Sequence, residues 1–352
     1  MLPALHSLVI LKPCCFGDVM LATPLLGVLR RAYPEARIDF AVGPHARAAV
    51  EANPLIDNRL DSGRVGQGSY PPADVLALIG KLRAGRYDAI FVPDRSPALA
   101  LAAFLSGISN RVGLDSGGRG RLYTHRVPVS GVRHEADLYL DLARAVNVPT
   151  DYAAVEYTPP AADRKVVVNL LAHHNLLDKT FILMHPGGGQ NPGMAFHEKR
   201  WPPPNFAQLA IRLMRGTGIP VALVGGIGDD PILATVKGLI NIPIAADFGP
   251  RPWGQIGALA ERCVLYVGND TGATHMAVGA GTRAAMILGP SDPRRYAPYG
   301  PPNWVSYVWR EWNVPTAGVS AGGPGFSWDN GATVEDVFET VMRLLYLGAR
   351  KP

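Results

Sequence analysis

Short apolar runs alternate with amphipathic stretches along the whole of this 352-residue chain. Runs such as 8–11 and 221–224 have the length and composition of buried strands. Stretches such as 19–33 repeat leucines at helical spacing and so have one apolar face. Buried strands that alternate with helices are typical of parallel sheets covered by helices on both sides. We therefore predict an α/β fold of doubly wound parallel sheets.

The alternation breaks between residues 149 and 164, where prolines and scattered polar residues replace the apolar runs. Such segments mark domain boundaries. We predict an N-terminal Rossmann-like domain over residues 1–160 and a C-terminal one over 161–332, facing each other across a cleft. The elements expected after the boundary include strands at 181–184, 221–224, 242–246, 264–267 and 284–288, and a last helix at 333–347.

Hydrophobic residues make up 47% of the chain and charged residues 18%, as in a globular protein rather than a disordered one. The longest apolar stretch, residues 97–108, is shorter than the roughly 18–20 residues that cross a membrane. The N-terminus lacks the basic region of a secretory signal, and three cysteines make no disulfide framework. These features predict a cytoplasmic protein in which the adjacent Cys14 and Cys15 pack at a strand end without pairing.

The segment from Asp270 to His275 follows the predicted strand 264–267 and opens a helix. The first N–H groups of a helix have no partner within it, and the helix dipole is positive at that end. Thr271 and Gly272 would then lie at an anion site suited to a phosphate, with Asp270 beside it for a sugar hydroxyl. An ordinary helix cap is the alternative, because Asp and Thr cap helices well.

A glycine run follows the predicted strand 181–184, and its backbone N–H groups could approach a phosphate closely. The run comprises Gly187, Gly188 and Gly189. Lys199 follows a few residues later and suits the charge of a diphosphate, while Asp229 ends a second glycine turn and suits a ribose. The alternatives for these features are a mobile loop, a solvated lysine and a helix cap.

Asp18 follows the first predicted strand, at the start of the helix 19–33. A carboxylate there could serve as a general base, and the positive end of the helix favours its ionised form. A helix cap is the alternative interpretation.

Arginines gather in the first half of the chain, and the net charge is +5. Arg119, Arg121 and Arg126 could line a groove for an anionic acceptor or for lipid headgroups; a solvated basic face is the alternative. Nucleic acid is not expected, because aromatic residues are sparse here and no nucleic-acid-binding motif occurs.

Four motifs occur in a fixed order along the chain. They are Gly-Asp-Val-x-x-Ala-Thr-Pro at 17–24, Lys-x-Trp-Pro at 199–202, Asp-Thr-Gly-x-x-His at 270–275 and Leu-Gly-Pro-x-x-Pro at 288–293. With them the chain resembles glycosyltransferase family 9, the heptosyltransferase family, over nearly its whole length. The resemblance implies a GT-B fold that binds the donor in the C-terminal domain and the acceptor in the N-terminal one. It also implies that residues 333–352 pack back toward the N-terminal domain.

The implied reaction is inverting, metal-independent transfer of a sugar, typically heptose from ADP-heptose, to a hydroxyl of a glycan or lipid-linked glycan. The nucleotide-diphosphate sugar is a co-substrate, and no cofactor or metal is expected. The sequence contains no Asp-x-Asp pair for a metal-bound diphosphate. A cytoplasmic location is expected, with peripheral association at the inner face of the membrane.

The resemblance also assigns roles by position. Asp18 matches the proposed catalytic base, Lys199 matches the lysine at the donor phosphate, and Asp229 approximately matches a ribose-binding acid. The loop for the donor's ribose and diphosphate comprises Asp270, Thr271 and Gly272, with His275 in the same motif. The chain departs from the family pattern at 14–16, where Cys-Cys-Phe replaces smaller residues, and at Arg283, where proline is usual.

Two other classes of function stay open at this point. A GT-B nucleotide-sugar epimerase also works without metal, and it differs in needing no acceptor. A non-catalytic protein could keep the nucleotide-sugar site alone, although it would have no need of a base such as Asp18.

Overall fold

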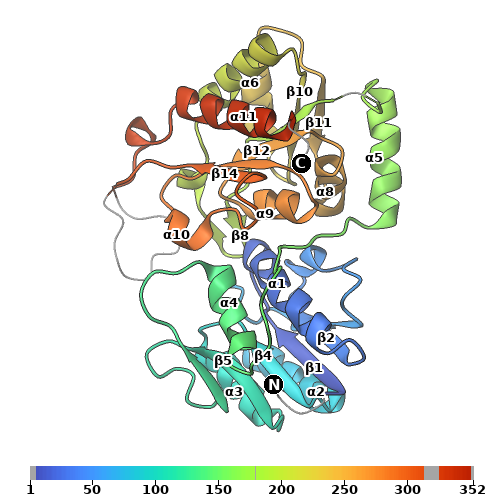
Figure 1. Ribbon diagram of the computed structural model, residues 1–352, viewed down its shortest axis with the longest axis vertical. Coiled ribbons are helices and arrows are strands. Elements are labelled where there is room, and N and C mark those ends of the chain that lie inside the picture. Colours follow the sequence, from blue (N-terminus) through green and yellow to red (C-terminus); the bar gives the residue numbers. More distant parts are fainter. Residues whose placement is uncertain (1–4, 179, 313–324, 350–352) are drawn as a thin grey trace. The chain divides into compact units, whose positions relative to one another are not determined.

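The computed structural model describes residues 5–178, 180–312 and 325–349. The chain divides into two compact units (Figure 1). Each unit has a hydrophobic core of its own. Unit 1 comprises Met1–Glu156 with Asn191–Met194, and unit 2 comprises Tyr157–Gln190 with Ala195–Pro352. The change of unit after Glu156 lies inside the irregular segment 149–164.

Unit 1 is built on a six-stranded parallel sheet in the order β3-β2-β1-β4-β5-β6. Its strands are β1 (Ser7–Leu11), β2 (Arg37–Val42), β3 (Asn58–Asp61), β4 (Ala89–Val92), β5 (Asn110–Asp115) and β6 (His125–Pro128). Its helices are α1 (Phe16–Ala32), α2 (Pro72–Gly85), α3 (Pro97–Leu105) and α4 (Glu135–Arg144), with a 3₁₀ turn η1 (Arg47–Ala49). The strand order reverses between β1 and β4, which is where open α/β sheets bind ligands, at the carboxyl ends of the strands.

The core of unit 1 explains why β1 and β4 are apolar throughout. Val9 and Leu11 of β1 and Ile90 of β4 pack with apolar residues of α2 and α3 on one face of the sheet. The alternate residues Leu8 and Ile10 are also fully buried. Because strands covered on both faces bury every side chain, their sequence is a continuous apolar run.

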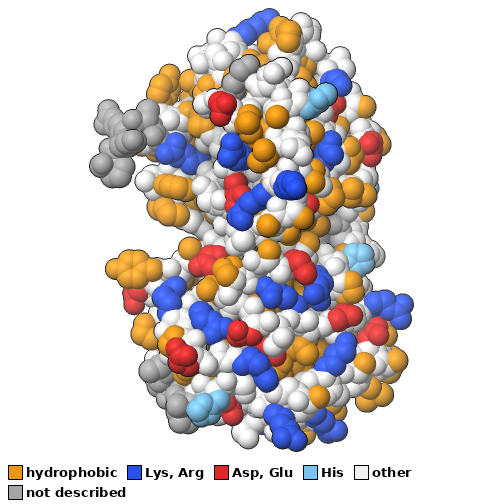
Figure 2. Space-filling view, turned by 90° about the vertical axis from the view of Figure 1, so that its right-hand side faces the viewer, with side chains coloured by type: hydrophobic (Ala, Val, Ile, Leu, Met, Phe, Trp, Pro, Cys, Tyr) orange, Lys and Arg blue, Asp and Glu red, His pale blue; other side chains and the backbone are white. Residues whose placement is uncertain are grey.

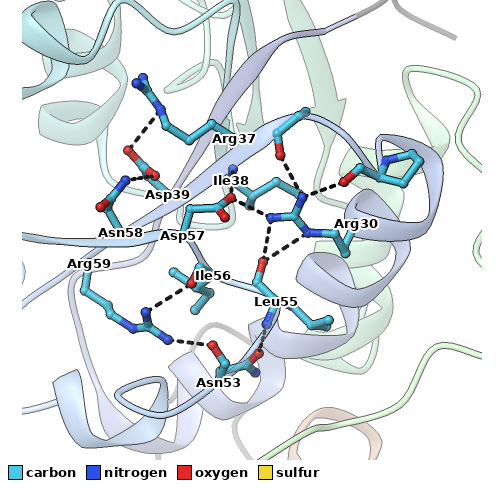
Figure 3. A network of polar contacts seen from close by, with 12 residues as sticks. Arg30, Arg37, Ile38, Asp39, Asn53, Leu55, Ile56, Asp57, Asn58 and Arg59 are labelled. Carbon is cyan, nitrogen blue, oxygen red and sulfur yellow. Dashed lines mark hydrogen bonds and ion pairs between the residues drawn. The ribbon is translucent and has the colours of Figure 1, made fainter.

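A network of polar contacts fixes the edge of unit 1 where α1 leads into β2 (Figure 3). The Arg30 guanidinium of α1 donates to the Leu55 carbonyl at 2.9 Å and to the Asp57 carboxylate at 2.7 Å. Asp57 also accepts from the Ile38 N–H at 2.7 Å. Burial by itself would raise the pKa of Asp57, but these hydrogen bonds and Arg30 hold it below its ordinary value.

Unit 2 repeats the architecture with a second six-stranded parallel sheet, in the order β11-β10-β7-β12-β13-β14. Its strands are β7 (Ile182–His185), β10 (Val221–Gly225), β11 (Ala246–Pro250), β12 (Leu265–Asn269), β13 (Ala284–Ile287) and β14 (Val305–Val308). Its helices are α5 (Ala161–His173), α6 (Pro203–Thr217), α7 (Asp230–Leu239), α8 (Trp253–Ala260), α9 (Gly272–Gly279), α10 (Pro293–Tyr296) and α11 (Val334–Ala349). A small ribbon, β8 (Gln190–Asn191) with β9 (Met194–Ala195), and the 3₁₀ turns η2 (His197–Lys199) and η3 (Trp328–Asn330) complete the described elements. The predicted pair of doubly wound parallel α/β sheets is confirmed.

One prediction about an element needs correction. The strand expected at 242–246 forms instead at Ala246–Pro250. Pro243 explains the shift, because proline has no N–H to donate to a ladder. The last helix, α11, packs its apolar face into the core of unit 2 through Val337, Val341 and Leu344, and its expected packing toward the N-terminal domain stays a prediction.

Helices α2, α3 and α5 were not expected, although each begins after a proline or with one. Within the residues that the structure describes, no helix is long and apolar enough to cross a membrane.

Candidate active site

The carboxyl ends of three neighbouring strands carry the motifs that were predicted to bind the donor. The sheet places β10, β7 and β12 side by side. The glycine run follows β7, Asp229 follows β10, and the Asp-Thr-Gly motif follows β12. Because parallel strands end at the same edge of a sheet, residues far apart in the sequence meet there.

Close packing explains why the turn after β7 consists of glycines. A Cβ atom on Gly187 would lie 2.0 Å from an oxygen of Asp229. Gly188 has a φ of +90°, and a Cβ atom there would lie 2.5 Å from the Cγ2 atom of Thr271. Gly189, at φ +74°, would place one 2.7 Å from the Phe196 carbonyl oxygen. A side chain at Gly187 or Gly188 would therefore separate this turn from the loops after β10 and β12, and one at Gly189 would clash with the Phe196 backbone.

Asp229 holds two glycine turns together. Its buried carboxylate accepts from the N–H of Gly226 at 2.8 Å and from the N–H of Gly188 at 3.2 Å. The guanidinium of Arg200 lies 3.6 Å from the same carboxylate and also donates to the Gly188 carbonyl oxygen at 2.7 Å. Asp229 thus contacts backbone N–H groups, Arg200 and the neighbouring His185, whereas the sequence suggested an acid for a ribose.

His185 lies at the end of β7, buried beside Asp229 at 3.9 Å. Burial lowers the pKa of its imidazole, with the charge of Asp229 acting in the opposite direction. Neither ring nitrogen has a hydrogen-bond partner among the described residues. A neutral imidazole stacked near Tyr266 fits a packing role under the glycine turn.

Lys199 and Asp270 form an ion pair of 2.7 Å at the start of the loop after β12. Burial by itself would raise the pKa of Asp270, but the charge and hydrogen bond of Lys199 hold it below its ordinary value, helped by Ser291. The ammonium group of Lys199 has three N–H groups, so donation to Asp270 occupies one of them. Phe196 and Tyr296 flank the ammonium, with ring centroids at 5.9 and 5.7 Å.

The first turn of α9 follows directly after Asp270 in the sequence. Thr271 is its N-cap residue, and the helix begins at Gly272. The Thr271 hydroxyl is buried and finds no hydrogen-bond partner within the described part of the chain. His275 is buried in the same turn, and its charge would lower the pKa of Asp270 if protonated. A hydroxyl and the first-turn N–H groups at one helix start have the chemistry to bind an anion, so the phosphate site stays a prediction.

Asn269 joins these parts and was not predicted as a site residue. Its side-chain oxygen accepts from the Trp201 N–H at 3.0 Å. Its amide group donates to the carbonyl oxygens of Pro186 and Gly187 at 2.9 and 3.1 Å. Trp201 in turn donates from its indole to the Ala332 carbonyl at 2.8 Å. An asparagine directly before Asp-Thr-Gly was the available sequence signal.

In unit 1, Asp18 lies in the first turn of α1. Its carboxylate accepts from the N–H of Cys15, the N-cap residue, at 3.3 Å. Burial raises the pKa of the Asp18 carboxyl, Lys12 opposes the rise, and Glu135 and Asp94 add to it, with a net value above the ordinary one. The helix start alone suggested a shift in the other direction, so that part of the sequence argument is wrong.

The residues around Asp18 form a partly buried charged cluster that the sequence did not reveal. Lys12, at the end of β1, donates to Asp94 after β4 at 2.9 Å and lies 5.4 Å from the ring of Tyr139. Glu135, at the start of α4, is buried and pairs with Arg95 at 2.9 Å. Burial by itself would lower the pKa of Lys12, but Asp94, Tyr139 and Asp18 hold it well above the ordinary value. The only sequence signal was that Lys12 interrupts an apolar run.

The prediction that Cys14 and Cys15 pack without pairing is wrong. Their sulfur atoms are bonded to each other, whereas unpaired packing was expected. Both lie in the turn between β1 and α1, which brings the two side chains together. Cys14 is buried and Cys15 is partly exposed.

The predicted acceptor arginines are exposed around β6, at one edge of the unit 1 sheet. Arg119 and Arg121 lie between β5 and β6, and Arg126 lies on β6, where it pairs with Asp115 at 3.0 Å. The face in Figure 2 shows Lys and Arg side chains interspersed with acidic ones. Within the described ranges, no group of three or more His, Cys, Asp or Glu side chains is placed to hold a metal ion.

The family model described as glycosyltransferase family 9 (heptosyltransferase) matches residues 75–319. The chain belongs to this family. The membership makes it a glycosyltransferase, and it confirms the resemblance. Asp18 precedes the matched range, whereas Lys199 and the Asp-Thr-Gly motif lie inside it.

Individual relatives have low sequence identity to this chain. The chain is 24% identical over 286 residues to an Escherichia coli lipopolysaccharide heptosyltransferase 3, covering 78% of this chain and 81% of the relative. A family 9 glycosyltransferase from Veillonella parvula has the same fold, with a TM-score of 0.78, 21% identity and coverage of 97% of both chains. The structure of E. coli ADP-heptose lps heptosyltransferase II matches with a TM-score of 0.75 and 21% identity, covering 98% of this chain and 100% of that one. These structures support the GT-B assignment.

Proposed function

We propose that this chain transfers a heptose from ADP-heptose to a hydroxyl of a lipopolysaccharide-type or other lipid-linked glycan, with inversion and without a metal. The site of unit 2 carries the proposal, because it unites a cation, a helix start and a buried hydroxyl around a glycine turn. Membership of a heptosyltransferase family supports the heptose. The fold shared with the E. coli ADP-heptose lps heptosyltransferase II supports ADP as the nucleotide.

The donor diphosphate would be held by Lys199, the first turn of α9 and the Thr271 hydroxyl. Transfer releases a nucleoside diphosphate whose charge must be stabilised as the glycosidic bond breaks. Lys199 retains N–H groups beyond the one given to Asp270, and the helix start adds backbone donors. Asp229 would contribute indirectly, because it fixes the glycine turn. Asp230, exposed at the adjacent helix start, is the acid that we assign to the ribose.

Asp18 would accept the proton of the acceptor hydroxyl as its oxygen attacks the anomeric carbon. A base works best when its pKa lies near the working pH, so the raised pKa of Asp18 makes it a better base than an exposed carboxylate. Lys12 would keep this carboxylate ionised despite its burial. The cluster around Asp18 therefore supports the role of base over that of a simple helix cap.

A face of unit 1 supports a lipid-linked acceptor. Leu76 of α2 is 67% exposed, and Leu101, Phe104 and Leu105 of α3 are 45%, 47% and 39% exposed. Neither residues 75–86 nor residues 97–110 include an acid, and the first range contains three cations, of which Lys81 and Arg83 lie on α2. An apolar face flanked by cations fits the headgroup region of an anionic membrane. We accordingly place the enzyme in the cytoplasm, at the inner face of the membrane, with no nucleic-acid partner.

The test is a transfer assay in EDTA with ADP-heptose and a heptose-accepting core oligosaccharide. Mass spectrometry should show the acceptor gaining one heptose, and NMR should show an inverted anomeric centre. Conversion of the donor to an isomer without acceptor would instead reveal an epimerase. Tight ADP-heptose binding with no turnover on any acceptor would point to a binding protein, and a strict need for magnesium would refute the metal-free mechanism.

A further inference from the structure

The turn between β1 and α1 contains two adjacent cysteines directly before the helix that carries Asp18. Their sulfur atoms form a bond in the structure. Cys15 is partly exposed, so a reagent in solution can reach this bond. Neither sulfur has a part in the transfer reaction proposed above.

Cys15 and Asp18 contact each other twice, each through its backbone N–H and the side chain of the other. The Cys15 N–H donates to the Asp18 carboxylate at 3.3 Å, and the Cys15 side chain faces the Asp18 N–H in a capping box. The Cys15 carbonyl oxygen accepts from the Val19 N–H at 2.9 Å and so begins α1. Any change at the Cys15 sulfur therefore acts on the residue that caps the helix and holds the carboxylate.

We propose that Cys14 and Cys15 are a redox-active modification site that sets how Asp18 is held, and thereby the rate of transfer. The inference rests on the proposed function in so far as Asp18 is the base. A dithiol reductant supplies two electrons and two protons: the bond between the sulfur atoms breaks, both cysteines become thiols, and the reductant leaves as its own cyclic disulfide.

The two states differ in hydrogen bonding at Asp18. In the disulfide, the Cys15 sulfur carries no hydrogen and can only accept. As a thiol it gains an S–H donor beside the carboxylate. A hydrogen bond to the ionised form makes a carboxylate a weaker base and occupies the oxygen that must take the proton. Reduction should therefore slow transfer.

The third cysteine serves as an internal contrast. Cys263 donates its S–H to the Ala260 carbonyl oxygen at 3.3 Å. Burial raises the pKa of its thiol to about 12, so it is a poor nucleophile at neutral pH. Cys263 belongs to unit 2 and has no place in the contacts of Asp18.

The experiment compares the full-length protein before and after reduction by a dithiol, with the reductant removed before assay. Alkylation in denaturant, where Cys263 also reacts, followed by intact-mass measurement should count one free thiol before reduction and three after it. The kcat for transfer should fall roughly tenfold on reduction, as expected for a new hydrogen bond to a charged group. The effect should reverse when the thiols are reoxidised.

Variants make the result specific. Cys263→Ser should keep both the rate and the redox response. In Cys14→Ser/Cys15→Ser, hydroxyl donors replace the thiols in every condition, so its rate should match the reduced protein and ignore reductant. A redox response retained in this double variant, equal rates in both states of the native chain, or three free thiols in the denatured protein before reduction would each overturn the proposal.

A readout without turnover separates this proposal from the proposed function. Hydrogen exchange of the Cys15 amide, followed by NMR, should speed up on reduction because the carboxylate that accepts from it is shared with the thiol. If exchange changes but no transfer occurs on any acceptor, the redox contact stands and the transferase assignment fails. If transfer occurs while exchange and rate ignore reduction, the redox proposal fails alone.

Discussion

At the scale of single residues, the surroundings of Asp270 and Asp18 shift the pKa values of these two carboxyl groups in opposite directions. Asp270 is paired with Lys199, and its pKa lies below the ordinary value. Asp18 is partly buried beside Lys12 and other acids, and its pKa lies above the ordinary value. One carboxylate therefore stays ionised as a fixed partner of the lysine, and the other can take up a proton. The first property suits a structural anion, and the second suits a base.

Replacing Lys199 tests the donor site. We expect Lys199→Ala to weaken ADP binding in EDTA by roughly ten- to a hundredfold, because it removes a charge-assisted hydrogen bond. Isothermal titration calorimetry measures the effect, and the melting temperature shows the cost of leaving Asp270 unpaired. Lys237→Ala is the matched control, since Lys237 forms an exposed ion pair with Asp247. Equal ADP affinity in both variants would exclude Lys199 from the donor site.

Replacing Asp18 tests the base. Asp18→Asn should lower kcat by about a hundred- to ten-thousandfold, the usual contribution of a positioned base, with ADP affinity unchanged. In the native chain, kcat/KM should rise with pH through the raised pKa of Asp18, because only the ionised form accepts a proton. Near-normal turnover of a folded variant would remove Asp18 from the mechanism.

The pKa shift of Asp18 also predicts the direction in which Asp18→Asn changes the stability of the fold. A carboxyl whose pKa is higher in the folded than in the unfolded chain stabilises below its unfolded pKa, and this contribution is lost as the pH rises through the folded value. At pH 7, Asp18→Asn should therefore melt at the same or a higher temperature than the native chain. Asp57→Asn provides the contrast. Its pKa is lowered, so its contribution is present above the unfolded pKa and is lost as the pH falls through the folded value. Asp57→Asn should melt lower, by an amount that vanishes in acid.

At the scale of elements, apolar runs predicted the central strands well. β1, β4, β7, β10 and β12 all lie where the sequence placed them, because strands buried on both faces have no polar alternation to obscure them. The edge strand β6 and the helix α2 escaped prediction, since partly exposed elements mix polar and apolar residues. The helix α3 escaped because it is apolar throughout and shows no polar face at helical spacing. The contact of Lys12 with Asp94 spans 82 residues and depends on β1 pairing with β4. No local pattern reveals such a pair.

Replacing Asp229 tests whether its hydrogen bonds to the two glycine turns of unit 2 support the proposed donor site. Asp229→Asn keeps the size of the side chain but removes one acceptor and the charge facing Arg200. We expect a loss of about 1–3 kcal/mol in the free energy of unfolding, with weaker ADP binding as a consequence of the loosened turn. Asp230→Asn, at the exposed neighbouring position, should leave stability unchanged and weaken binding of ADP more than that of pyrophosphate. A stable Asp229→Asn variant would contradict the role of this carboxylate in holding the turns.

At the scale of the whole molecule, the protein combines a net charge of +5 with an exposed apolar face on α2 and α3. Each Lys or Arg near an anionic surface contributes about 1 kcal/mol to binding, and the contribution falls as salt screens it. Burial of Leu101 and Phe104 among acyl chains would add a term that salt does not screen. Membrane binding through this face should therefore need both anionic lipid and these side chains.

Vesicle co-sedimentation tests this prediction. The native chain should bind phosphatidylethanolamine vesicles that contain phosphatidylglycerol, and bind vesicles without it much more weakly. Leu101→Ser/Phe104→Ser should lower the affinity for the anionic vesicles by at least tenfold, because two half-exposed apolar side chains no longer insert. Leu239→Ser is the matched control: this leucine is 48% exposed at the end of α7 in unit 2, and its loss should change nothing. Transfer to a water-soluble acceptor should be the same in all three proteins, since the face lies outside both candidate sites. Equal binding of the double variant and the native chain would show that α3 does not meet the membrane, and equal binding to charged and uncharged vesicles would show that the cations have no part in it.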